Sequence, residues 1–459
     1  MLDKLIWRHT VDTVKIINEA VDKYRDSILE TERYIWNNPE TGYREWKTHA
    51  HLKAKYEALG YEVHEASNVP GFYVDIDTGK EGPCVLVLGE MDSVICPEHP
   101  ESDKETGAVH ACGHNTHSAS LFGIAAALKE PGVLDGLCGK IKLCAVPAEE
   151  LLEIEYRSEL KKQGIIKYFG GKSEFLHRGY FDGVDLAFMV HSAGKFSISK
   201  GCFIGCVAKT IIYKGKAAHA GGAPHMGRNA LYAATCGLNA VNAIRETFLN
   251  MDYIRVHPIM TSGGSMVNAI PSEARIESYV RGKTFGAIKK VNRKVNQALI
   301  GAALSIGTNI EIIDFPGYSP MVQNADLADV FAEAAASIIP NYECKVVNSV
   351  ATGSTDMGDL SCIMPVQHGN AAGARGTGHG MDFYIVDPVA ACVDSAKLQV
   401  MMLHILLSEN GERAKSIVAA YKPQFASKEE FLTFIDELND SGDRIEYLED
   451  GTAKVRIDK

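Results

Sequence analysis

The sequence predicts an α/β fold that carries a smaller α+β domain as an insertion. Strand-like apolar runs alternate with helical patterns through the first part of the chain, which is typical of an α/β sheet. The pattern changes near Gly201 and the α/β texture resumes after Pro316, so the stretch between them is predicted to be a separate small domain. The expected segments are the first part of the larger domain over 1–200, the inserted domain over 201–315, the second part of the larger domain over 316–410, and a C-terminal extension over 411–459.

The larger domain is expected to alternate strands with helices. Short apolar runs bounded by glycine, proline or charged residues indicate buried strands, and longer patterned stretches indicate helices. The predicted strands cover 84–88, 141–146, 187–190 and 344–347, and the predicted helices cover 118–128, 327–338 and 390–407.

The inserted domain is expected to contain two strand-helix units, which are enough for a small α+β domain. The predicted elements are strands over 207–213 and 274–280 and helices over 229–249 and 287–304. In the C-terminal extension we expect a short amphipathic helix over 428–438 and a hairpin around 449–451.

Length, charge and cysteine content disfavour several classes of protein. The 459 residues suffice for about three domains of ordinary size. Lys plus Arg minus Asp plus Glu is 47 − 58 = −11, and no basic patch offsets this excess, so nucleic acid is not an expected partner. No apolar stretch reaches the ~18–20 residues of a membrane span, and the charged N-terminus lacks an export signal, so no membrane is expected either. Eleven cysteines without paired spacing suit a reducing compartment, so the expected location is the cytoplasm.

One short stretch gathers most of the residues that bind metals. Between His110 and His117 the sequence places one cysteine and three histidines at the mouth of a predicted helix. Thiolate and imidazole are the usual ligands of zinc and related cations. Cys112 and His114 are two residues apart, so an extended backbone would direct both side chains to one side. Ordinary histidines packed beside a buried cysteine are the competing interpretation.

Carboxylates and two further histidines follow other strand-like runs. Glu149 and Glu150 end one run, where one carboxylate can bind a metal while the other moves a proton, although two solvated glutamates in a turn would look the same. His191 ends another run, and His379 lies in a glycine-rich loop. Strand ends and glycine loops are where α/β folds bind ligands. Together with the cysteine cluster, these residues are enough for two metals that share a site.

The ordered motifs resemble the aminoacylase-like metallopeptidases, specifically the branch that contains indole-acetyl-amino-acid hydrolases and aminobenzoyl-glutamate hydrolases. The resemblance extends from about residue 38 to about residue 407 and covers 38–43, 89–92, 110–117, 147–150, 219–227, 268–271, 354–359 and 378–379. It implies a mixed-sheet catalytic domain with an inserted ferredoxin-like dimerisation domain. It also implies a homodimer with two divalent metal ions per subunit, Zn or Mn.

The resemblance also implies a role for each matching residue. The implied metal ligands are Cys112, His114, Glu150, His191 and His379. Glu149 would be the general base, and Asp92 would orient the ligands. His219 and Asn268 match positions that reach the substrate, and the histidine commonly enters the active site of the partner subunit. The implied activity is hydrolysis of the amide bond of small N-acyl or N-aroyl amino acids by a metal-activated water. A dipeptidase or carboxypeptidase of the same family, or a non-catalytic binding relative, is the alternative.

Other positions concern specificity. Arg281 ends a strand-like run in the inserted domain, where its guanidinium would bind a substrate carboxylate or form a structural salt bridge. Glu90 and Asn115 stand where auxin-conjugate hydrolases usually carry Asp. Leu151 and Leu152 stand where relatives usually place glycines, and a charged segment to about Gly179 follows them. We expect this segment to reshape the mouth of the pocket. Residues 170–173 superficially resemble a phosphate-binding loop but lack its first glycine, and we assign them to a turn.

Overall fold

The computed structural model describes residues 11–339 and 345–458 and divides the chain into two compact units. The first unit comprises 1–202, 322–349 and 359–428, and the second comprises 203–321, 350–358 and 429–459. The segment expected as one C-terminal extension, 411–459, is therefore divided between the units at residue 428. Each unit has its own hydrophobic core.

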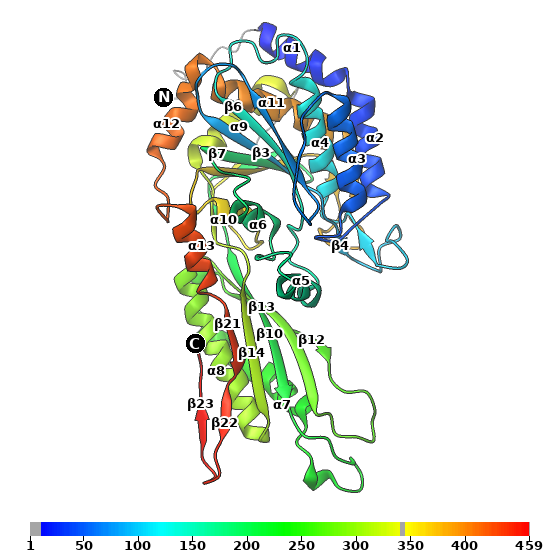
Figure 1. Cartoon of the computed structure of the whole chain (residues 1–459), viewed down its shortest axis with the longest axis vertical. Helices are drawn as coiled ribbons and strands as arrows, with labels where there is room; N and C mark the ends of the chain where they lie inside the picture. The colour runs from blue at the N-terminus through cyan, green and yellow to red at the C-terminus, as the bar shows by residue number, and fades with distance from the viewer. Residues whose placement is uncertain (1–10, 340–344, 459) are drawn as a thin grey trace. The chain divides into compact units, whose positions relative to one another are not determined.

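An eight-stranded mixed sheet forms the centre of the first unit (Figure 1). The strands lie in the order β1-β2-β6-β3-β7-β18-β8-β16. Their bounds are β1 His64–Glu65, β2 Phe72–Asp77, β3 Cys84–Glu90, β6 Lys140–Val146, β7 Leu186–Ser192, β8 Ser197–Ser199, β16 Lys345–Val347 and β18 Val366–Ala371. The four neighbours β6, β3, β7 and β18 are mutually parallel. They read as continuous apolar runs because helices and loops cover both faces of a buried parallel sheet.

Helices cover this sheet in layers. Helix α4 (His114–Ala127) packs against β3 and β7, and α2 (Arg25–Trp36) packs on α4 (Figure 1). Every residue of α4 is buried, which explains its lack of an amphipathic pattern. The other helices of this layer system are α1 Val11–Asp22, α3 Trp46–Ala58, α9 Ala325–Ile338 and α11 Ser395–Leu407.

The helix predicted over 390–407 begins with a π-helical turn, Val389–Asp394, and continues as α11. The stretch Val389–Leu407 is long and apolar enough to cross a membrane, but 83% of its most apolar window is buried inside the protein. It is therefore explained as a core helix.

The second unit is a β-α-β-β-α-β sandwich of one sheet and two helices. Its elements are β10 Gly205–Lys214, α7 Ala230–Ala243, β12 Ile259–Ser262, β13 Glu273–Gly282, α8 Phe285–Ile306 and β14 Asn309–Pro316. Strand β13 lies between β12 and β10, and β10 lies between β13 and β14. Along β13 alternate residues are buried, as expected for a strand with one face on the core. The tail adds α13 (Lys428–Asp436), the strand β21 (Asp440–Asp443), which pairs with the free edge of β14, and the hairpin β22 (Ile445–Tyr447) and β23 (Ala453–Val455).

Several elements differ from their predictions. The helix predicted over 229–249 stops at Ala243 and is followed by two 3₁₀ turns. Residues 170–173 are not a turn, because helix α6 (Gly171–His177) begins there. The charged segment after Leu152 also contains helix α5 (Ile154–Lys162). The strand predicted from residue 344 starts at Lys345, and Cys344 lies outside the described residues.

Candidate metal centre

Metal-binding side chains gather at the carboxyl ends of the four parallel strands. Asp92 follows β3, the pair Glu149 and Glu150 follows β6, His191 lies at the end of β7, and His379 lies in the loop after β18. The carboxyl ends of parallel strands meet at one edge of a sheet, where open α/β folds bind ligands. The five predicted metal ligands and the predicted base therefore all lie in the first unit, at one edge of its sheet.

The Cys112–Gly113–His114 stretch is shaped by its glycine. Gly113 caps the N-terminus of α4 with φ 85°, and a Cβ atom there would lie 1.9 Å from Ser192 Oγ. No other residue fits both the left-handed backbone and this close approach. His114 Nδ1 donates to Asp92, with 3.0 Å to its carbonyl oxygen and 3.1 Å to Oδ1. The opposite nitrogen, Nε2, is buried and makes no hydrogen bond, so it is oriented and available as a ligand.

His191 shows the same arrangement. Its Nδ1 lies 2.8 Å from the carbonyl oxygen of Ser192, to which it donates. Its Nε2 lies 3.5 Å from Cys112 Sγ. A backbone acceptor thus fixes the tautomer, and the other ring nitrogen faces the cysteine.

The glutamate pair is held by a strained turn. Ala148 has φ 56°, which is unusual for a residue other than glycine, and its N–H donates to Glu45 Oε1 at 2.8 Å. The N–H of Glu150 donates to Asp92 Oδ2 at 2.8 Å. Asp92 therefore positions both Glu150 and His114 through its two carboxylate oxygens.

His379 completes the cluster. Its N–H donates to the carbonyl oxygen of Ala111 at 2.8 Å, and its Nε2 lies 2.9 Å from Glu150 Oε1. Its side chain is 52% exposed, whereas Glu149 and Glu150 are 7% and 9% exposed. His379 is thus the most open member of the cluster.

Two groups of three side chains could each hold a cation, and they share Cys112. One group is Cys112, His114 and His191, and the other is Cys112, Glu150 and His379. Within each group the donor atoms lie within 4.8 Å of one another. Thiolate, imidazole and carboxylate donors at this spacing fit zinc or another divalent transition metal.

Glu90 and His117 form further possible ligand groups that the sequence analysis did not include. Glu90 belongs to a group with His117 and His191 and to another with His114 and Glu149. Its Oε2 lies 3.1 Å from His117 Nδ1, and its Oε1 accepts a hydrogen bond from the buried Lys172. The third histidine of the motif, His110, is buried without a hydrogen-bond partner.

Charges within the cluster favour the metal-binding forms of its side chains. Burial and Glu150 raise the pKa of the Cys112 thiol, but His114 and His191 lower it more, to about 6. Burial also raises the pKa of Glu150, but the hydrogen bond and charge of His379 lower it to about 2. Thiolate and carboxylate therefore predominate at neutral pH.

A cavity of about 770 Å³ opens beside this cluster within the first unit. Its lining includes Cys112, His191 and His379. It also includes Arg375, which the sequence analysis missed because a single arginine in a glycine-rich loop resembles any surface charge.

The remaining predicted site residues belong to the second unit. His219 Nδ1 accepts hydrogen bonds from the N–H groups of Gly221 and Gly222 at 3.2 and 2.9 Å, so its Nε2 carries the proton and can donate. Asn268 accepts a bond from the N–H of Ala220 through its carbonyl oxygen. Arg281 donates to Ser354 Oγ at 3.1 Å and forms no ion pair with any described residue, so the salt-bridge interpretation is not supported.

A parallel α/β sheet that ends in clustered thiolate, imidazole and carboxylate groups defines a hydrolase of the metallopeptidase class, which acts on amide or peptide bonds. The chain belongs to peptidase family M20/M25/M40, whose family model matches residues 86–403. The resemblance found in the sequence is confirmed.

Individual relatives are distant. The chain is 26% identical over 332 residues to a polypeptide of the p-aminobenzoyl-glutamate hydrolase of Escherichia coli, covering 70% of this chain and 64% of that protein. It is 27% identical over 367 residues to Xaa-Arg dipeptidase of Mus musculus, covering 76% and 77% of the two chains. Among solved structures, a dinuclear metal binding peptidase of the M20 family from Bacillus subtilis superposes with a TM-score of 0.62 at 19% identity, covering 84% of this chain and 98% of that one. That likeness supports the mixed α/β fold.

Proposed function

We propose that this protein hydrolyses the amide bond of N-acyl or N-aroyl amino acids with two divalent cations, Zn²⁺ or Mn²⁺. The observation that carries the proposal is the pair of ligand groups that share Cys112 at the carboxyl edge of the sheet. Cations bound there would supply a Lewis acid for the amide carbonyl and a water of lowered pKa. Their proposed ligands are Cys112, His114, Glu150, His191 and His379.

Glu149 is the proposed general base. It is held beside Glu150 on the Ala148 turn and is only 7% exposed, so its carboxylate is kept in place. Its carboxylate accepts the proton of the attacking water and delivers it to the leaving nitrogen, which departs only when protonated.

The proposed role of His219 is to donate a hydrogen bond from Nε2 to the developing oxyanion. Its loop supports this role, because two backbone N–H groups fix the tautomer that donates. Asn268, the neighbour of the residue that bridges to His219, is the proposed second contact with the substrate. Arg281 is the proposed anchor of a substrate carboxylate.

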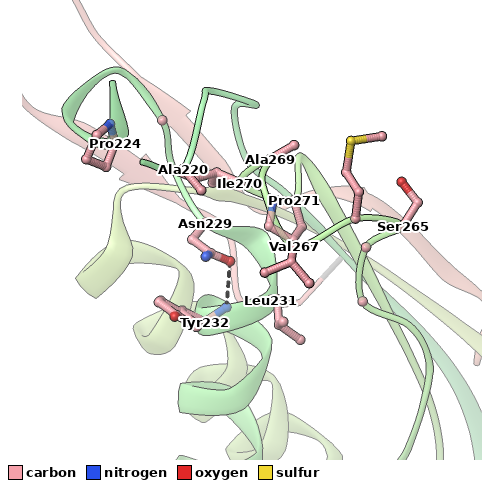
Figure 2. A pocket seen from close by; sticks show the side chains of 14 residues that line it. Ala220, Pro224, Asn229, Leu231, Tyr232, Ser265, Val267, Ala269, Ile270 and Pro271 are labelled. Atoms are coloured by element: carbon pink, nitrogen blue, oxygen red, sulfur yellow. Dashed lines mark hydrogen bonds between the residues drawn. The ribbon is translucent and has the colours of Figure 1, made fainter. Parts of the chain in front are cut away.

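A homodimer is proposed, in which His219 enters the partner's site. Apolar side chains that are unusual on a monomer surface support it: Tyr232 on α7 is 63% exposed, Ile259 on β12 is 62% exposed, and Val267 is fully exposed. Figure 2 shows Tyr232 and Val267 around a cavity of about 670 Å³ in the second unit. Strand β12 pairs on one side only among the described residues, whereas β21 covers the opposite edge of the sheet.

Mixing two inactive variants tests both the dimer and the role of His219. Glu149→Gln and His219→Ala should each be inactive, and a refolded or co-expressed mixture should regain up to a quarter of wild-type activity if His219 acts on the partner subunit. Sedimentation should give a species of two chains. Absence of any recovery in a proven mixed dimer would contradict action across the interface.

The activity itself is tested with a substrate panel. p-Aminobenzoyl-glutamate, N-acetyl amino acids and dipeptides are incubated with enzyme loaded with Zn²⁺ or Mn²⁺ and again after chelation. Chelator-sensitive hydrolysis of the acyl amino acids supports the proposal. Hydrolysis of dipeptides alone would favour the dipeptidase that the mouse relative suggests. For the location we propose the cytoplasm, which the ten described cysteines support because all of them are free.

A further inference from the structure

Arg375 is an unpaired cation in the wall of the metal-site cavity. It lines the same cavity as Cys112, His191 and His379, and its side chain is exposed. It forms no side-chain hydrogen bond or ion pair with any residue that the structure describes. A guanidinium without a protein partner, beside the reacting centre, is available to a ligand.

The backbone around Arg375 is fixed, although its side chain is free. Arg375 belongs to β19 (Ala374–Arg375), which pairs with β20 (Tyr384–Ile385). The next residue, Gly376, has φ 96°, and a Cβ atom there would lie 2.0 Å from the carbonyl oxygen of Asp382. On the other side, the N–H of Ala374 donates to the carbonyl oxygen of Ala193 at 3.0 Å, two residues after His191. The Cα of Arg375 is therefore held at a constant place relative to the ligands.

The charge of the cavity wall points to the sign of its ligand. The lining residues include one arginine and no lysine, aspartate or glutamate. The whole chain has a net charge of −11, which repels anions at most of its surface. A single cation at the cavity would attract an anion there and would orient a planar carboxylate by two parallel hydrogen bonds.

We infer that Arg375 determines specificity for amide substrates that carry a free carboxylate near the scissile bond. The inference rests on the proposed amidohydrolase function and narrows its substrate class from amides in general to anionic amides. Arg281 is a less favourable anchor, because it already donates to Ser354. The carboxylate has two possible sources in an acyl amino acid, the α-carboxylate and an acidic side chain, and the test separates them.

Binding is measured in the Glu149→Gln background, so that turnover does not interfere. The ligands are p-aminobenzoyl-glycinamide, which is neutral, p-aminobenzoyl-glycine, which has only the α-carboxylate, and p-aminobenzoyl-glutamate, which has both. Arg375→Gln should weaken binding of the carboxylate ligands by about 10- to 100-fold and leave the neutral amide within about threefold. Loss at p-aminobenzoyl-glycine identifies the α-carboxylate, and loss only at p-aminobenzoyl-glutamate identifies the side-chain carboxylate.

Two variants serve as controls. Arg375→Lys keeps the charge but not the fork of donors, so an intermediate loss is expected. Lys195→Gln removes the same charge from an exposed residue near the cavity that does not line it, and should leave all affinities unchanged. The same ratio of affinities for anionic and neutral ligands in Arg375→Gln as in its parent, including equal absence of binding, would overturn the inference.

Kinetics in the wild-type background keep this outcome separate from the proposed function. Release of p-aminobenzoate by the wild type tests the amidohydrolase, and the ratio of kcat/KM for glycine and glycinamide substrates in Arg375→Gln tests the arginine. Hydrolysis with an unchanged ratio would overturn the role of Arg375 and leave the amidohydrolase intact. No hydrolysis by a metal-loaded wild type would refute the amidohydrolase, while the affinities above still decide the role of Arg375.

Discussion

The guanidinium of Arg157 donates a hydrogen bond to the main-chain oxygen of Glu150. A second donor of Arg157 bonds the carbonyl oxygen of Phe169 at 2.7 Å, and the side chain is only 1% exposed. Arg157 lies on α5, in the charged segment that replaces the glycines of relatives. This segment is therefore attached directly to the turn that carries Glu149 and Glu150.

Replacement of Arg157 by Met should loosen that turn. It leaves the Glu150 carbonyl oxygen buried without a donor, which costs about 1–3 kcal/mol of unfolding free energy. Metal affinity should fall by about 10- to 100-fold, because the support of a ligand is lost. Lys162→Met on the same helix changes a side chain that is 76% exposed and should affect neither quantity. The attachment has no influence on the cluster if metal affinity is the same in both variants.

The buried pair of Glu90 and Lys172 predicts strong coupling in a double-mutant cycle. Both side chains are at most 1% exposed, and Lys172 Nζ bonds Glu90 Oε1. Lys172→Met leaves a buried carboxylate without its cation and should cost about 3–5 kcal/mol in urea unfolding. Adding Glu90→Gln should recover part of that loss. Losses that simply add in the double variant would show that the two groups do not interact.

Glu32 should limit stability at neutral pH. Burial raises the pKa of this carboxyl, which accepts a hydrogen bond from Asn115 Nδ2 at 2.7 Å. Because the folded-state pKa is raised, the cost of the buried charge is fully present above that pKa and disappears below the unfolded value near 4.5. Glu32→Gln keeps an acceptor for Asn115, so it should raise Tm at pH 8 and have a vanishing effect below pH 4. A stabilisation that grows as the pH falls would have the wrong sign.

Asn115 also explains one departure from related hydrolases. With Asp at position 115, its carboxylate would face that of Glu32 inside the protein, whereas the amide donates to it.

The sequence was sufficient for the core of the sheet and for the ligand cluster. Runs such as 84–88 and 141–146 are buried on both faces, so their apolar character is continuous along the chain, and they form β3 and β6. Cys112 and His114 stand two residues apart, so their proximity is a local property. Their role as ligands stays a prediction.

Contacts between distant residues were not predictable. Lys172 and Arg157 have the same local appearance as solvated charges, and only folding brings them to Glu90 and Glu150. The pairing of β21 with β14 joins segments more than a hundred residues apart, and nothing local marks either strand as the partner of the other. Helices α1, α2 and α3 were also missed, because their burial depends on packing around the distant α4 and α11.

Glu149→Gln should separate metal binding from catalysis. The amide keeps the size of the side chain but cannot accept a proton, so kcat should fall by about 10²–10⁴-fold. Metal content should equal that of the wild type, because Glu149 is not among the proposed ligands. Near wild-type turnover would exclude Glu149 as the base.

The central claim is that cations held through Cys112 perform the hydrolysis. Metal content per chain of the wild type and of Cys112→Ala, measured by mass spectrometry after equilibration with Zn²⁺, tests it most directly. We expect two ions per chain in the wild type, loss of at least one in Cys112→Ala, and loss of p-aminobenzoyl-glutamate hydrolysis with it. Two ions and unchanged hydrolysis in Cys112→Ala would contradict the claim.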